Sequence, residues 1–191
     1  DWHDAGLQVV AIADARHNPR GSLVEEARAK GIRILTSSAV VESRGSKRVT
    51  GARVAAIDVK AHKVTSPGEW LECDLVASSG GYSPVVHLAS HLGGKPVWRE
   101  DILGFVPGDA PQKRVCVGGI NGVFALGDSL ADGFAGGALA ASEAGFKAPA
   151  VTVPKTLARQ EEATVALFQV PHDKNTARAP KQFVDQQNDV T

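Results

Sequence analysis

The sequence is short of several residue types, and each shortage excludes a class of protein. It contains no methionine and begins with Asp1, and because translation starts at methionine, we expect a piece of a longer polypeptide. Only two cysteines are present, Cys73 and Cys116, far apart and outside any CxxC pair. This usage is typical of buried, reduced thiols in a cytoplasmic protein and excludes a disulfide framework or a cysteine zinc site.

A charge excess and long apolar runs are also missing. The 21 Lys and Arg residues balance 21 Asp and Glu residues, whereas a nucleic-acid surface needs a basic excess. No stretch approaches the roughly 18 apolar residues of a membrane-spanning helix, and the first residues do not resemble a signal peptide. With 43% hydrophobic and 22% charged residues, the composition predicts a globular domain that binds neither nucleic acid nor membrane.

The first part of the chain has the pattern of a β-α-β unit. Gly6 suits the end of a helical turn, and residues 7–13 are apolar enough for a strand buried on both faces. An S-x-x-E capping box at Ser22 begins a predicted helix over 23–30, and a second strand begins at 32–35. This order predicts an α/β fold with a Rossmann-like, doubly wound parallel sheet.

Residues 39–73 break that order with extended segments separated by polar turns, which predicts an antiparallel β-meander inserted into the parallel sheet. Residues 74–79 then return to a buried strand that ends at Gly80 and Gly81. Adjacent glycines at the carboxyl end of such a strand allow close approach of a ligand to the backbone. After residue 147, scattered prolines and the loss of periodicity predict an irregular, Pro-rich C-terminal segment.

The pattern at Asp128 is the best candidate for a binding site. Two short strands, 115–119 and 122–126, precede Gly127-Asp128-Ser129 and a small-residue helix predicted over 136–145. A carboxylate where a strand meets a helix N-terminus is stabilised by amide donors and by the helix dipole. There it can accept a hydrogen bond from a ribose hydroxyl. The alternative is that Asp128 or Ser129 only caps the helix.

Two other sets of residues are candidate sites. Asp14 ends a predicted parallel strand, where an acidic residue can bind an adenosine ribose, but no G-x-G-x-x-G loop stands about 20 residues before it. A structural role for Asp14 is therefore preferred, and Arg16 either pairs with Asp14 or meets a 2′-phosphate. His87 and His91 lie one turn apart on a predicted helix, with no third ligand nearby for a metal. No residues form a nucleophile with its base, so we expect no chemistry from this chain alone.

Three stretches together resemble the alpha subunits of heterotetrameric sarcosine oxidases. They read DLVASSGGYSPVVHLASHLGG, GVFALGDSLADGFAGGALAASEAG and QVPHDKNTARAPKQFVDQQNDVT. The third, ending K-x-F-V-D-x-Q-N-D-V-T, is the most specific, and it resembles that family's linker between a dinucleotide-binding part and a folate-binding part. The strand-Gly-Asp-helix pattern is shared with the wider superfamily of two-dinucleotide-binding flavoprotein reductases.

The resemblance implies an enzyme that oxidatively demethylates sarcosine to glycine, produces hydrogen peroxide and passes the one-carbon unit to tetrahydrofolate. It implies a structural NAD in the alpha subunit, FAD and FMN elsewhere in the complex, and beta, gamma and delta subunits as partners. In this chain, residues 1–114 would form a nested second dinucleotide-binding-like domain, 115–147 a returning segment that completes the first, and 148–191 a connector. The cofactor-binding residues it implies are Gly119, Phe124, Leu126, Gly127, Asp128 and Ser129, with Gly80 and Gly81 more loosely.

Two alternatives stay open at this point. The chain could be an NAD(P)H-dependent reductase domain of a flavoprotein, in which Asp14 and Arg16 face a mobile nicotinamide cofactor. It could also be a ligand-free structural or docking domain that serves subunit assembly.

Overall fold

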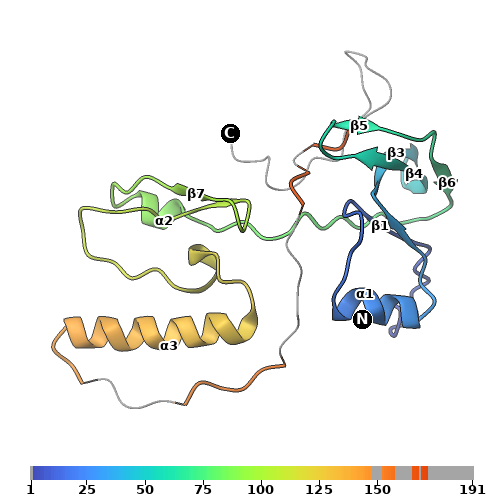
Figure 1. Ribbon diagram of the computed structural model, residues 1–191. Helices are drawn as coiled ribbons and strands as arrows, with labels where there is room; N and C mark the ends of the chain where they lie inside the picture. The colour runs from blue at the N-terminus through green and yellow to red at the C-terminus, as the bar shows by residue number, and fades with distance from the viewer. Residues whose placement is uncertain (1, 148–151, 158–164, 168, 172–191) are drawn as a thin grey trace. The chain divides into compact units, whose positions relative to one another are not determined.

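The computed structural model describes residues 2–147, 152–157, 165–167 and 169–171 (Figure 1). Most of the predicted connector 148–191 lies outside these residues. The chain divides into two compact units with their boundary between Gly80 and Gly81. The first unit contains residues 1–80 and 160–191, and the second contains residues 81–159. Parallel and antiparallel strands both occur, with few helices, so the fold is mixed α/β.

The first unit opens with a turn that closes as helix C-termini do. The Gly6 amide donates to the His3 carbonyl and the Leu7 amide to the Trp2 carbonyl, each at 3.0 Å. Gly6 has φ +89°, the left-handed conformation that this Schellman pattern requires and that glycine adopts without steric cost. The predicted helical turn ending at Gly6 therefore has its expected hydrogen bonds.

A β-α-β unit follows, as the sequence predicts. Strand β1 (Ile12–Asp14) pairs in parallel with β2 (Ile34–Thr36), and helix α1 (Ser22–Ala29) forms the crossover. The capping box is wrong, because Gly21 is the N-cap and no side chain caps the helix. Ser22 already lies in the first helical turn, and Glu25 instead forms an ion pair with Arg28 at 2.7 Å.

The prediction that residues 7–13 form a strand buried on both faces is also wrong. Only Ile12 and Ala13 of that stretch lie in β1, and Leu7, Val10 and Ile12 are 47%, 41% and 37% exposed. In the described part of the chain, β1 has β2 as its only partner strand. A two-stranded sheet with one crossover helix is too small to cover both faces of an apolar strand.

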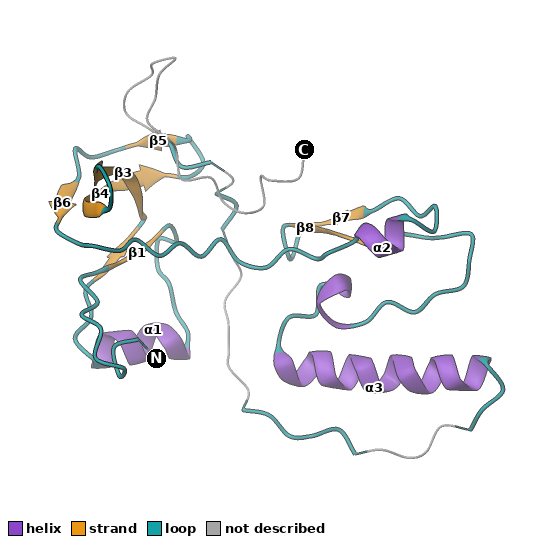
Figure 2. Ribbon diagram, turned by 180° about the vertical axis from the view of Figure 1, so that it is seen from behind, coloured by secondary structure: helices purple, strands orange, loops and turns teal. Residues whose placement is uncertain are grey.

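The antiparallel meander predicted for 39–73 is confirmed, and it holds the core of the first unit. Its strands are β3 (Ser38–Gly45), β4 (Val49–Asp58), β5 (Lys63–Val64) and β6 (Glu69–Leu71), with β4 pairing to each of the others. In both views β1 lies between α1 and these strands (Figures 1 and 2). The central cluster consists of Ala39, Val41, Ala55 and Ile57, against which Leu167 and Val170 pack from the far end of the sequence.

The second unit contains helix α2 (His87–Ser90), the antiparallel hairpin β7 (Val97–Arg99) and β8 (Gly104–Val106), a 3-10 turn over Gly118–Asn121, and helix α3 (Leu126–Glu143). The strands predicted over 74–79, 115–119 and 122–126 are wrong, because these segments have no strand partner among the described residues. Helix α3 begins at Leu126 and not at Gly136, so Gly127, Asp128 and Ser129 form its first turn.

The cysteines and the helices bear on two further expectations from the sequence. Cys73 and Cys116 are both free, but each is half-buried and not fully enclosed. Within the described ranges, no helix combines the length and apolar character needed to cross a membrane.

Candidate functional site

The first turn of α3 presents the carboxylate of Asp128 to solvent. The N-cap is Ala125, in an extended conformation (φ −64°, ψ 132°), and no side chain caps the helix. The interpretation of Asp128 or Ser129 as a cap is therefore wrong. Asp128 is exposed, and none of the hydrogen bonds or ion pairs found among the described residues involves its carboxylate. A negative charge in the first turn is stabilised by the helix dipole. Asp128 is therefore a favourably placed hydrogen-bond acceptor that receives no hydrogen bond from the described residues.

Two other polar side chains of α3 fasten the helix to the segment before it. The Ser129 hydroxyl donates to the Val123 carbonyl at 2.6 Å. The Asp132 carboxylate accepts a hydrogen bond from the Gly118 amide at 2.7 Å. Asp132 was missed by the sequence analysis, although its position one turn after Asp128 places it on the same side of the helix. The 3-10 turn is thus held beside the helix start.

The other predicted residues of this unit gather around the same place. The rings of Phe124 and Tyr82 stack with centroids 5.4 Å apart at 29°, and Gly81 precedes Tyr82 in the sequence. A Cβ on Gly119 would lie 4.0 Å from the Phe124 ring, so Gly119 adjoins it. Gly80 is the last residue of the other unit. Six of the eight predicted residues therefore lie in the first turn of α3 or in the segment just before it.

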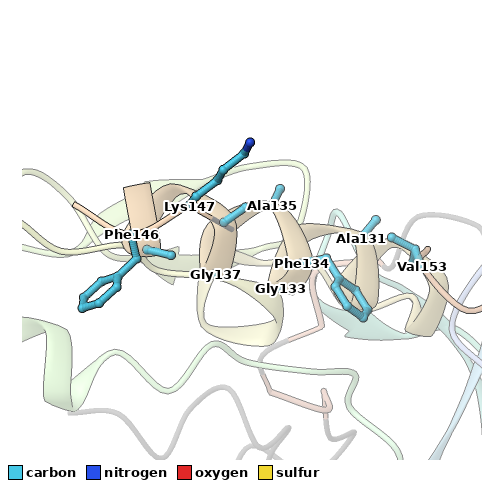
Figure 3. A pocket seen from close by; sticks show the side chains of 10 residues that line it. Ala131, Gly133, Phe134, Ala135, Gly137, Phe146, Lys147 and Val153 are labelled. Atoms are coloured by element: carbon cyan, nitrogen blue, oxygen red, sulfur yellow. The ribbon is translucent and has the colours of Figure 1, made fainter. Parts of the chain in front are cut away.

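Gly127 is required by a close contact. A Cβ at this position would lie 2.5 Å from the Thr156 hydroxyl oxygen, so the segment 152–157 passes directly against the helix start. Leu126, by contrast, is 66% exposed. Further along α3, Ala131, Phe134 and Ala138 border an open, apolar hollow of about 650 Å³ (Figure 3).

Asp14 has the structural role that the sequence analysis preferred. Its two carboxylate oxygens accept hydrogen bonds from Nε and Nη2 of Arg16 at 3.0 and 2.6 Å, and from the Arg16 amide at 2.9 Å. Burial by itself raises the pKa of Asp14, but these hydrogen bonds outweigh it and lower the pKa below its usual value. The carboxylate is thus held ionised by its own neighbour.

The two predicted histidines lie at the two ends of the short helix α2. His87 is the first residue of α2, and His91 follows its last residue. In the part of the chain that the structure describes, no three His, Cys, Asp or Glu side chains gather as metal ligands would.

Comparison with known proteins finds chains that are similar to this one. No protein-family model matches it. It is 33% identical over 185 residues to a sarcosine oxidase subunit alpha of Corynebacterium sp. (strain P-1), and 35% identical over 187 residues to that of strain U-96. It is 32% identical over 187 residues to that of Rhizobium meliloti (strain 1021). These matches cover 96–97% of this chain but only 17–19% of each relative. Along nearly its whole length, this chain is therefore similar to one segment of these sarcosine oxidase alpha subunits.

Proposed function

We propose that this chain is part of the alpha subunit of a sarcosine oxidase-like complex, where it helps to bind NAD and performs no chemistry alone. The reaction of the complex is the oxidative demethylation of sarcosine to glycine, with hydrogen peroxide as a product and transfer of the one-carbon unit to tetrahydrofolate. The names and the near-complete coverage of this chain by three alpha subunits support this proposal.

The observation that carries the NAD-binding role is the carboxylate of Asp128 in the first turn of α3, which has no partner among the described residues. A ribose hydroxyl donates hydrogen bonds, and a carboxylate near a helix N-terminus is a strong acceptor for them. A phosphate would be repelled by the same charge, so this end of α3 suits the sugar of a dinucleotide better than its pyrophosphate. Gly119 lies beside Phe124, just before the helix, and carries no side chain that would block the approach.

The remaining parts of the chain have supporting functions in this proposal. The β1-α1-β2 unit belongs to a larger Rossmann-like sheet in a nested domain over 1–114, and 115–147 returns to complete the NAD-binding domain. Residues 148–191 connect it to a downstream domain. FAD and FMN are bound elsewhere in a cytoplasmic complex with beta, gamma and delta subunits. The NAD(P)H reductase alternative loses support because Arg16 already occupies both oxygens of Asp14.

The test is the NAD content of the full-length subunit carrying Asp128→Asn, with Glu143→Gln in the last turn of the same helix as a control. Both changes remove one negative charge from α3 without altering side-chain size. Loss of a charge-assisted hydrogen bond weakens binding by about tenfold or more. We expect NAD to be lost from the first variant and retained by the second. Equal NAD content in both variants contradicts the role of Asp128.

A further inference from the structure

The hairpin of β7 and β8 carries an arginine whose guanidinium is held in one orientation. Nε of Arg99 donates to Oδ1 of Asp101 at 3.0 Å, and Nη2 donates to Oδ2 of the same carboxylate. A two-pronged pair of this kind fixes the plane of the guanidinium. The remaining nitrogen, Nη1, therefore points in a defined direction, and it donates to the Asn121 carbonyl at 3.0 Å.

Asn121 is the last residue of the 3-10 turn that precedes α3. The last carbonyls of a helical turn have no partner within the turn, and Arg99 supplies the donor for this one. The next residue, Gly122, is left-handed with φ +75°. A Cβ at Gly122 would lie 2.6 Å from Cδ1 of Ile102 and 3.2 Å from Nη1 of Arg99. The hairpin thus lies directly against the end of the turn.

The same segment is also attached to α3. The Gly118 amide donates to Asp132, and the Val123 carbonyl accepts from Ser129. These hydrogen bonds hold the first residue of the 3-10 turn and a residue just after it. The end of the turn, at Asn121, is held by the hairpin instead. The position of the turn beside the helix start therefore depends on contacts from two different elements.

We propose that Arg99 is a positioning residue for the NAD site at the start of α3, and that it acts through the Asn121 carbonyl on the turn that carries Gly119. This inference rests on the proposed function and adds to it a residue from a separate hairpin. Arg99 makes no contact with the dinucleotide in this proposal. It keeps the turn in place, so that the ribose reaches Asp128 across a surface that is already ordered before binding.

The test compares Arg99→Met with Arg114→Met in the full-length subunit, by titration with NAD after removal of bound cofactor. Methionine keeps an unbranched apolar side chain and removes every hydrogen-bond donor. Arg114 is a matched control, because its guanidinium also donates to two backbone carbonyls of the second unit, those of Ala89 and Gly108. We expect NAD to bind about tenfold more weakly to Arg99→Met, the worth of one charge-assisted hydrogen bond, and to change by less than about twofold in Arg114→Met.

A double-mutant cycle with Asp128→Asn gives a readout that a purely structural function of Arg99 would not change. If Arg99 positions the contact made by Asp128, its removal should cost little once that carboxylate is gone. The combined variant Arg99→Met with Asp128→Asn should then bind NAD about as weakly as Asp128→Asn alone. Arg99→Lys keeps the charge but not the planar fork. Its affinity should lie between those of the unaltered subunit and Arg99→Met, and it replaces Arg99→Met in the cycle if that variant fails to fold.

Three results would overturn this inference and leave the proposed function standing. The first is unchanged NAD affinity in the Arg99 variants while Asp128→Asn binds weakly. The second is an equal loss in Arg99→Met and Arg114→Met, which would mean general destabilisation of the unit. The third is a combined variant in which the two separate losses multiply. Normal NAD binding by Asp128→Asn would instead refute the proposed function, and the positioning function of Arg99 with it.

Discussion

At the scale of single residues, Asp128 and Asp132 show how one helix can place two similar side chains in different functions. They lie one turn apart on α3, yet Asp132 accepts the Gly118 amide while Asp128 has no partner among the described residues. Asp132 therefore contributes to folding, and Asp128 is available for a ligand. Their substitution should separate stability from binding.

Asp132→Ala is expected to destabilise the second unit by about 1–2 kcal/mol, because it leaves the Gly118 amide without its charged acceptor. Asp128→Ala should cost less than half of that, since it loses only the favourable interaction with the helix dipole. Hydrogen exchange of the peptide covering 115–123 is the measurement. Faster exchange in both variants alike would contradict the assignment.

Asp14 makes stability depend on pH in a definite direction. Its pKa in the folded state is lowered below the ordinary value of 3.8, so the stabilisation is complete above that value and is lost as the pH falls through the lower, folded-state pKa. Asp14→Asn should lower stability by about 1 kcal/mol at neutral pH. Urea unfolding midpoints at pH 7 and near pH 3 would show the difference between the two proteins shrinking, and a constant difference would exclude this origin.

At the scale of secondary structure, the glycines of α3 differ in whether their position leaves room for a side chain. Gly136 touches Val117 and Val115, whereas a Cβ added at Gly133 would meet nothing within 4 Å. The same substitution should therefore have opposite effects at two positions three residues apart.

Gly133→Ala is expected to stabilise the second unit by about 0.5–1 kcal/mol through the higher helix propensity of alanine. Gly136→Ala should instead destabilise it by about 1–3 kcal/mol, because the new methyl group would overlap Val117. Thermal unfolding followed by the helical circular dichroism signal would show the two shifts. Stabilisation by both would mean that α3 does not pack on 115–117 through Gly136.

The elements that could be predicted from sequence are those specified by local patterns. Gly6 marked the turn before β1, and the polar turns between apolar segments marked the meander. The strands over 74–79 and 122–126 were wrongly predicted because an apolar run shows burial but not the partner strand that a ladder needs. Leu75, for example, is 62% exposed. The start of α3 was missed because Gly127 suggested a turn, whereas its contact with Thr156 explains a glycine inside a helix.

Part of the candidate site could also be predicted, because that part depends on local sequence patterns. Residues 119–129 are close in sequence, so their clustering at the helix start needed only a local turn. Asp132 and the stacking of Tyr82 on Phe124 depend on tertiary contacts, which no short motif encodes.

At the scale of the whole molecule, the first unit is discontinuous in sequence. Leu167 and Val170 pack on the cluster of Ala39, Val41, Ala55 and Ile57, although the second unit lies between them in the chain. Leu167 and Val170 therefore contribute to the stability of a core formed by residues 39–57. The second unit has its own contacts around α3.

Leu167→Ala is expected to destabilise the first unit by about 1–2 kcal/mol through lost apolar burial and to leave the second unit unchanged. Hydrogen exchange measured separately on peptides from 39–57 and from 126–143 distinguishes the units. An equal change in both regions would show that they unfold together, and no change in either would remove Leu167 from the core.

The tip of the β3–β4 hairpin has a practical use. Residues 44–48 are all exposed and belong to no buried cluster, and exposed polar tips are the places where chains accept insertions. A short epitope or a fluorescent protein placed between Ser46 and Lys47 should leave the strand pairing from Ser38 to Arg44 intact. Such a fusion would provide a marker for following the assembly of the full-length subunit in living cells.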